Sequence, residues 1–151
     1  SVNNSNVNLS KLLERLCLIY EVLAFEKQIK LTYYIEQSIF INGYEKDIEN
    51  AISIILENAI KYNIPNGMIA LNLIKSKDLV KIEISDTGIG ISDIDLPHIF
   101  ERFYISSSYR NDSFGLGLSI AQAIILRHSG SIKVKSSLGK GTTFIITLPK
   151  S

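Results

Sequence analysis

Residues 86–91 read Asp-Thr-Gly-Ile-Gly-Ile, and they directly follow a run of alternating apolar and polar residues from Leu79 to Ser85. A second glycine pair, Gly115 and Gly117, opens a helical pattern. Glycine lets the backbone approach a ligand closely, and a helix N-terminus offers free N–H groups to an anion. The two clusters together therefore suggest a phosphate-binding site. Each pair taken alone is more typical of a turn, and neither completes a P-loop or a dinucleotide-binding fingerprint.

The hydrophobic periodicity around these clusters predicts helices and short strands in an irregular order. Residues 86–114 show little periodicity apart from a helical turn at 96–103, which is typical of a functional loop or lid. Because strands and helices do not alternate regularly, we expect an α+β fold with one mostly antiparallel sheet and three main helices on one face. In chain order the expected elements are a helix at 9–27, strands at 29–35 and 39–42, a helix at 44–62, a hairpin of strands at 68–74 and 79–85, a helix at 116–128 that Gly130 ends, and strands at 131–136 and 142–148.

Two of the expected helices have a clear apolar stripe. The stripe of the 9–27 helix comprises Leu9, Leu12, Leu13, Leu16, Ile19, Tyr20 and Leu23, and that of the 44–62 helix comprises Ile48, Ile52, Ile55 and Ala59.

Composition excludes several classes of protein. The chain has 151 residues, 46% of them hydrophobic, and its net charge of +1 comes from both signs scattered along the sequence. The length and the hydrophobic content are enough for one domain with its own core. The near-zero net charge provides no electrostatic field that would hold a nucleic acid. One cysteine, Cys17, and two histidines cannot make a zinc finger, and we expect Cys17 to be a buried, inert thiol.

The N-terminus and the lack of long apolar runs define the expected domain boundaries. No apolar run approaches the roughly 18 residues of a membrane span. Residues 1–8 are rich in Asn and Ser, without the basic and apolar regions of an export signal. We therefore expect residues 1–8 to be a linker from a longer protein and residues 9–151 to be a single domain.

Asn58, Lys61 and Tyr62 lie at helical spacings of three and four, which places them on one face of the 44–62 helix. An amide oxygen, a cation and an aromatic ring suit a metal–phosphate group beside a flat base. Most such triplets are only a solvated helix face. The binding interpretation gains weight here because the triplet precedes Asp86, both glycine clusters and a loop of lid length.

Five segments of the chain resemble, in order and spacing, the conserved boxes of the ATP-binding catalytic domain of bacterial two-component sensor histidine kinases. Residues 57–62 resemble the N box, 86–91 the G1 box, 99–104 the F box, 115–120 the G2 box, and 139–149 the closing strand. The resemblance covers nearly the whole chain from Leu9. It implies a Bergerat-type fold, which is a two-layer α/β sandwich, and membership of the GHKL superfamily with ATP and Mg²⁺ as cofactors.

The resemblance also implies a role for each matching residue. Asn58 would bind Mg²⁺, Lys61 would neutralise phosphate charge, and Tyr62 would lie against the nucleotide. Asp86 would accept a hydrogen bond from the adenine amine, and Arg102 and Arg110 would contact the γ-phosphate. Phe100 and Phe103 would anchor the lid and the contact with a partner domain. The other nucleotide-binding positions that it implies are Gly88, Gly90, Ile91, Gly115, Leu116, Gly117, Leu118 and Thr142.

Three departures from the family pattern bear on the activity. Ile54 stands where hydrolysing relatives and anti-sigma serine kinases carry a glutamate, and a hydrocarbon cannot take a proton from water. Phosphoryl transfer to histidine needs no such base, because a neutral imidazole is already nucleophilic near pH 7. In the lid, Ile105 and Ser113-Phe114 replace an arginine and a glycine. The alternatives are thus a regulatory module that binds nucleotide without kinase activity, or a GHKL-type ATPase.

Neither histidine lies in a phospho-acceptor context, so we expect His98 and His128 to be structural. The chain would then donate the γ-phosphoryl group of Mg·ATP to a histidine on a dimerisation domain that lies upstream. The resemblance implies that domain and a response regulator as partners, without nucleic acid or direct membrane contact. We expect the isolated domain to be a monomeric cytoplasmic part of a protein anchored in the bacterial membrane.

Overall fold

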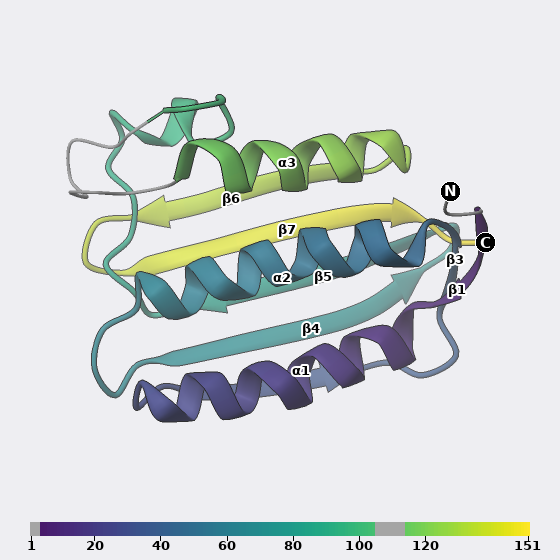
Figure 1. Cartoon of the computed structure of the whole chain (residues 1–151), viewed down its shortest axis with the longest axis horizontal. Helices are drawn as coiled ribbons and strands as arrows, with labels where there is room; N and C mark the ends of the chain where they lie inside the picture. Colours follow the sequence, from purple (N-terminus) through teal and green to yellow (C-terminus); the bar gives the residue numbers. More distant parts are fainter. Residues whose placement is uncertain (1–3, 105–113) are drawn as a thin grey trace.

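A computed structural model describes residues 4–104 and 114–151, in which three helices cover one face of a five-stranded sheet (Figure 1). The strand order is β2-β4-β5-β7-β6; β2 and β4 run parallel, and the other neighbours are antiparallel. This confirms the expected α+β sandwich. The elements are α1 (Leu9–Glu26), α2 (Glu45–Lys61), α3 (Phe114–Arg127), β2 (Lys30–Ile35), β4 (Met68–Ser76), β5 (Leu79–Asp86), β6 (Ser131–Ser137), β7 (Gly141–Pro149) and a 3-10 turn at Leu96–His98.

The core lies between the helices and the sheet, as the two periodicities require. Alternate residues of β4, β5 and β7 point toward the helices and are buried, in the order expected for a sheet with one covered face. The predicted stripe of α2 is confirmed, since Ile48, Ile52, Ile55 and Ala59 are all buried. These contacts hold α2 across the middle of the sheet, and its C-terminal end lies near the end of β5.

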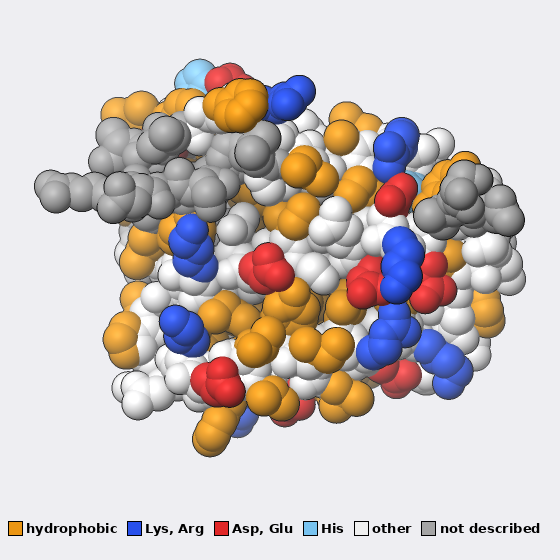
Figure 2. All heavy atoms as spheres, viewed as in Figure 1, with side chains coloured by type: hydrophobic (Ala, Val, Ile, Leu, Met, Phe, Trp, Pro, Cys, Tyr) orange, Lys and Arg blue, Asp and Glu red, His pale blue; other side chains and the backbone are white. Residues whose placement is uncertain are grey.

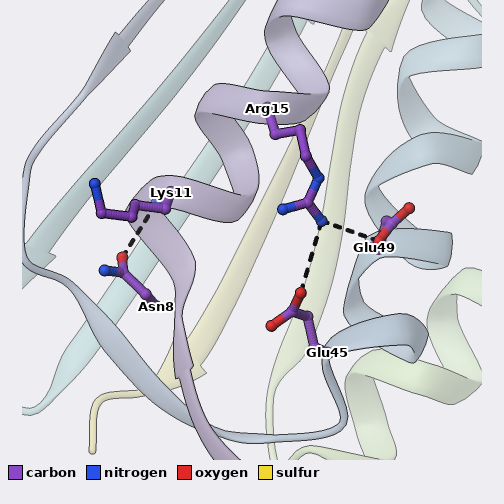
Figure 3. Close-up of polar contacts among 5 residues, drawn as sticks. All are labelled: Asn8, Lys11, Arg15, Glu45 and Glu49. Atoms are coloured by element: carbon purple, nitrogen blue, oxygen red, sulfur yellow. Dashed lines mark hydrogen bonds and ion pairs between the residues drawn. The ribbon is translucent and has the colours of Figure 1, made fainter.

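Polar contacts fix α1 at its start and against α2 (Figure 3). The side chain of Asn8 caps α1 by accepting a hydrogen bond of 3.1 Å from the Lys11 N–H. Arg15 reaches Glu49 at 3.2 Å and Glu45 at 3.6 Å, both on α2. Because these three side chains are 30–49% exposed to water, the ion pairs contribute little stability and mainly align the two helices.

The predicted apolar stripe of α1 is partly wrong. Ile19 and Leu23 are 50% and 43% exposed, whereas Cys17 and Ala24 are fully buried in their place. The buried face of α1 is thus rotated toward smaller residues, which lets the helix pack closely on β2. The prediction for Cys17 is confirmed: burial, with Glu21 and Glu14 nearby, raises the pKa of its thiol to about 12.

The expected linker at residues 1–8 is corrected in its second half. Ser5–Asn8 form β1, which pairs antiparallel with β3 (Phe40–Gly43) in a separate two-stranded sheet. Val7 is 1% exposed and supplies the apolar contact that the Asn/Ser-rich composition concealed. The domain therefore begins before Leu9.

The segment at 96–103 and both ends of α3 also differ from expectation. α3 begins at Phe114, two residues earlier than predicted, and the helical turn expected at 96–103 is shortened to Leu96–His98. At the end of α3 it is Ser129, with φ of 62°, that takes the left-handed conformation. Gly130 donates its N–H to the Ile125 carbonyl at 3.0 Å, and a Cβ there would collide with the Thr147 carbonyl. The left-handed Ser129 thus ends the helix, and glycine is needed at position 130 for close packing and not for a left-handed φ.

On the face seen in Figure 2, basic and acidic side chains are interspersed. Within the described ranges, no helix is both long enough and apolar enough to cross a bilayer.

Candidate functional site

A cavity opens where the end of α2, the end of β5 and the start of β7 meet. Its lining joins six residues predicted from the sequence with one that was not: Asn58, Tyr62, Asp86, Gly90, Ile91, Thr142 and Phe144. The antiparallel register of β5 and β7 brings two of these residues together, because Asp86 lies directly opposite Thr142. A larger hollow of about 1160 Å³ lies beside β2 and the end of α1, and none of the predicted site residues lines it.

Asp86 contributes a carboxyl group to the lining of the cavity. Its Oδ1 accepts the Gly88 N–H at 2.8 Å and the Thr142 N–H at 3.2 Å. Burial raises the pKa of Asp86 to about 6, although the two backbone hydrogen bonds act in the opposite direction. Near pH 7 the group is mainly a carboxylate whose Oδ2 can accept a hydrogen bond from a ligand.

The loop after β5 is held against the turn between β6 and β7. Ile89 donates its N–H to the Tyr62 carbonyl at 3.0 Å and accepts the Gly139 N–H at 2.9 Å. Gly90 has φ of 77°, and a Cβ there would collide with the Ser137 carbonyl. Glycine is therefore required at position 90 by both conformation and space.

Ser136, at the end of β6, connects this loop to β7. Its Oγ accepts the Ile91 N–H at 2.8 Å, donates to the Gly141 carbonyl at 2.9 Å and lies 2.8 Å from the Thr142 Oγ1. Sequence reasoning missed Ser136, because a serine in an alternating strand looks like any solvent-facing polar position.

Phe144 was missed as well. It is 5% exposed, lines the cavity and packs edge-on against Phe100, with ring centroids 6.3 Å apart. The signal was available, since alternation places residue 144 on the same face of its strand as Thr142. Phe144 thus links the floor of the cavity to the F-box segment.

Several predicted residues do not line this cavity. Lys61 lines a neighbouring groove between the ends of α1 and α2, with its Nζ 5.3 Å from the centroid of the Tyr62 ring. Arg102 lies over Phe103 and lines a groove along α3. Leu118 is fully buried in the core. Gly88 is buried at the start of the loop, and Gly117 lies in α3 against Ile54.

The remaining predictions concern residues near the lid. Arg110, Ile105 and Ser113 lie outside the described residues. Gly115 and Leu116 belong to the first turn of α3, and the described detail covers only their backbone.

Asn58 offers a hard oxygen ligand at the cavity. It is half-buried on the last turns of α2, and its side-chain amide can present an oxygen there. Mg²⁺ in nucleotide sites takes one or two such protein oxygens and completes its shell with phosphate oxygens and water. The residues present therefore fit a magnesium ion held jointly with a phosphate ligand. Within residues 4–104 and 114–151, no three His, Cys, Asp or Glu side chains gather to hold a metal.

The two histidines have structural contacts, as expected. His128 accepts the Tyr44 N–H through Nε2 at 3.1 Å, and its Nδ1 lies 2.8 Å from the Ile124 carbonyl. It therefore satisfies the N-terminus of α2 from the end of α3. His98 pairs with Glu101 at 2.7 Å and stacks on Tyr104, with ring centroids 5.0 Å apart.

Residues 43–151 match the model of a protein family described as histidine kinase-, DNA gyrase B- and HSP90-like ATPase. The chain belongs to this family. Within it, the expected relation to the catalytic domains of sensor histidine kinases is confirmed. The sensor histidine kinase YclK of Bacillus subtilis (strain 168) is 36% identical over 160 residues, which cover 98% of the chain and 33% of YclK.

Solved structures of histidine kinases share the fold of this ATPase-family chain. Full-length ShkA in complex with AMPPNP has a TM-score of 0.85 at 24% identity, covering 100% of the chain and 32% of ShkA. ThkA in complex with the response regulator protein TrrA has a TM-score of 0.82 at 22% identity, covering 99% and 42%. The chain spans about a third of the length of the curated relatives that it matches.

Proposed function

We propose that this domain binds Mg·ATP and donates the γ-phosphoryl group to a histidine on a separate dimerisation domain. The observation that carries the proposal is the Asp86 carboxylate in the cavity, with both backbone hydrogen bonds on Oδ1. An adenine presents a flat ring and an exocyclic amine. The amine would donate to Asp86 Oδ2, and the ring would lie between the apolar walls made by Ile91 and Phe144, which are 4% and 5% exposed.

The phosphates would extend from this pocket toward the start of α3. Gly115 and Gly117 lie in its first turns, where a helix offers backbone N–H groups to an anion. Asn58 would hold Mg²⁺, and Lys61 would approach the phosphates from the last turn of α2. Arg102 and Arg110 are the cations proposed for the γ-phosphate. A bound Mg²⁺ would neutralise charge on the phosphate oxygens.

In the transfer itself, this chain positions the nucleotide and excludes water, and the histidine is the nucleophile. A lone pair of the neutral imidazole forms the N–P bond to the γ-phosphorus as the bond to the bridging oxygen breaks. ADP leaves with that electron pair. Lys61 and the arginines would offset the charge that builds on the leaving group, and Asn58 would hold the Mg²⁺ that supplies further positive charge.

The acceptor domain needs a docking surface near the γ-phosphate. A groove of about 500 Å³ runs along α3 and is lined partly by Phe100, Ile120 and Leu126. Phe103, Ile120 and Leu126 are 66%, 43% and 58% exposed. We assign this apolar surface to the acceptor domain. The response regulator would be engaged by the full-length, membrane-anchored kinase. The complex of ThkA with the response regulator protein TrrA supports a response regulator as the partner.

Calorimetric titration with Mg·ATP tests the proposed site. A hydrogen bond to a charged group contributes about 1.5–3 kcal/mol, so Asp86→Asn should weaken ATP roughly ten- to hundredfold. Asp93→Asn is the matched control, because Asp93 is an exposed acid in the same loop. Equal affinities of the wild type and Asp86→Asn would refute the site.

Phosphotransfer in trans tests the proposed activity. The isolated chain should not label itself from γ-labelled ATP, and it should label an added histidine-bearing domain of the same kinase. Tight ATP binding without transfer would indicate a regulatory nucleotide-binding module. Labelling at His98 or His128 would show that the acceptor lies within the chain.

A further inference from the structure

Ser136 has a completely used hydroxyl group at the edge of the cavity. A serine hydroxyl has one hydrogen to donate and two lone pairs to accept with. The hydrogen goes to the Gly141 carbonyl at 2.9 Å, and one lone pair takes the Ile91 N–H at 2.8 Å. The contact of 2.8 Å with Thr142 can then be made only if Thr142 donates its own hydrogen to Ser136.

This assignment fixes what Thr142 presents to the cavity. Its side chain is 7% exposed and belongs to the lining, while its N–H donates to Asp86 Oδ1 at 3.2 Å. With its hydrogen committed to Ser136, the Thr142 hydroxyl oxygen has only lone pairs left. Asp86 and Thr142 would thus both act as acceptors on one side of the cavity.

We propose that Ser136, which does not line the cavity, is a positioning residue that sets base specificity by holding Thr142 as an acceptor beside Asp86. Two acceptors match the two hydrogens of an exocyclic amine and repel a carbonyl at the same place. The inference rests on the proposed nucleotide function and names the base feature that the site reads. The same Ser136 oxygen also accepts the Ile91 N–H and so holds the loop after β5, which means that Ser136 fixes both Thr142 and Ile91 in the lining of the cavity.

The test compares two ligands, ATP and purine ribonucleoside triphosphate, which differ only in the exocyclic amine. In Ser136→Ala, the Thr142 hydroxyl has lost its hydrogen-bond acceptor and is free to turn, so its lone pairs are no longer held toward the amine. Loss of one such hydrogen bond should weaken ATP about tenfold and the amine-free analogue less than twofold. Ser136→Thr keeps the hydroxyl and should restore the preference for ATP. Ser137→Ala, an exposed serine on the same strand, is the matched control.

The outcomes separate this inference from the proposed function. Parallel loss of both ligands in Ser136→Ala would mean that Ser136 only stabilises the loop, and the inference would be overturned. No binding of either ligand by the wild type would refute the nucleotide site itself. If Ser136→Ala proves unstable, the ratio of the two affinities in Ser136→Thr and in Thr142→Val decides instead: Thr142→Val should reduce the preference for ATP to what Asp86 alone provides, and Ser136→Thr should keep it.

Discussion

Ile54 on α2 packs against Gly117 on α3, so that a Cβ added to Gly117 would lie 3.4 Å from Ile54 Cγ2. Position 54 is therefore an apolar contact between two helices, one turn before Asn58. An alanine at position 117 would only touch this branched side chain, whereas a residue larger than alanine would press on it, so the contact favours a small residue in the first turns of α3. The contact also bears on which reaction the site supports.

Ile54 leads us to expect very slow ATP hydrolysis. A hydrocarbon cannot accept the proton of an attacking water, so that route lacks its general base. A phosphate-release assay with saturating Mg·ATP should show release no faster than that of Asp86→Asn, which serves as the background. Steady release well above this background would instead assign the chain to the hydrolysing branch of its family.

Asp86 should make stability depend on pH. Its pKa is about 6 in the folded chain and about 3.9 when unfolded, so the folded state binds the extra proton between these values. The resulting stabilisation is complete below about pH 4 and is lost as the pH rises through about 6, a total of about 3 kcal/mol. Urea unfolding of the wild type and Asp86→Asn across this range measures it, and the variant should lack this component. Parallel pH profiles would contradict the raised pKa.

The magnesium dependence of nucleotide binding should pass through Asn58. Asn58→Ala removes the amide oxygen, so the gain in ATP affinity on adding Mg²⁺ should fall about tenfold, with little change in affinity when Mg²⁺ is chelated. Asn50→Ala, an exposed asparagine on the same helix, should behave as the wild type. An unchanged magnesium effect in Asn58→Ala would place the ion on other ligands.

The sequence predicts the fold well because the decisive signals are local. The alternation in β4 and β5 and the stripe of α2 each follow from neighbouring residues, and the antiparallel register then brings Asp86 opposite Thr142. β1 was missed because its pairing with β3 is non-local and its only strongly apolar residue is Val7. Ser136 was missed for a similar reason, since its role depends on Ile91, 45 residues away.

The arginines mark another limit of sequence reasoning. Arg102 matches a family motif, yet its guanidinium stacks over Phe103 at 5.3 Å and lines the groove along α3. A motif assigns a residue type to a segment, but the direction of a long, exposed side chain depends on what packs beside it. The motif therefore does not predict the direction in which the Arg102 side chain lies in this structure.

Gly90 and Gly139 offer a matched test of why the site needs glycine. Both are left-handed, with φ of 77° and 79°, so alanine costs about 1–2 kcal/mol at either position from conformation alone. A Cβ at Gly139 meets nothing within 4 Å, whereas one at Gly90 would collide with the Ser137 carbonyl and approach Leu138 Cα at 3.0 Å. Gly90→Ala should therefore destabilise the domain more than Gly139→Ala does in urea unfolding, by about a further 2 kcal/mol.

The same pair of variants should differ in ATP affinity. Gly90→Ala should weaken ATP binding, because Gly90 lines the cavity, and Gly139→Ala should leave the affinity of the folded protein unchanged. Equal losses of stability and affinity in both variants would mean that only the backbone conformation matters, and that the close approach of the loop to the β6–β7 turn does not shape the cavity.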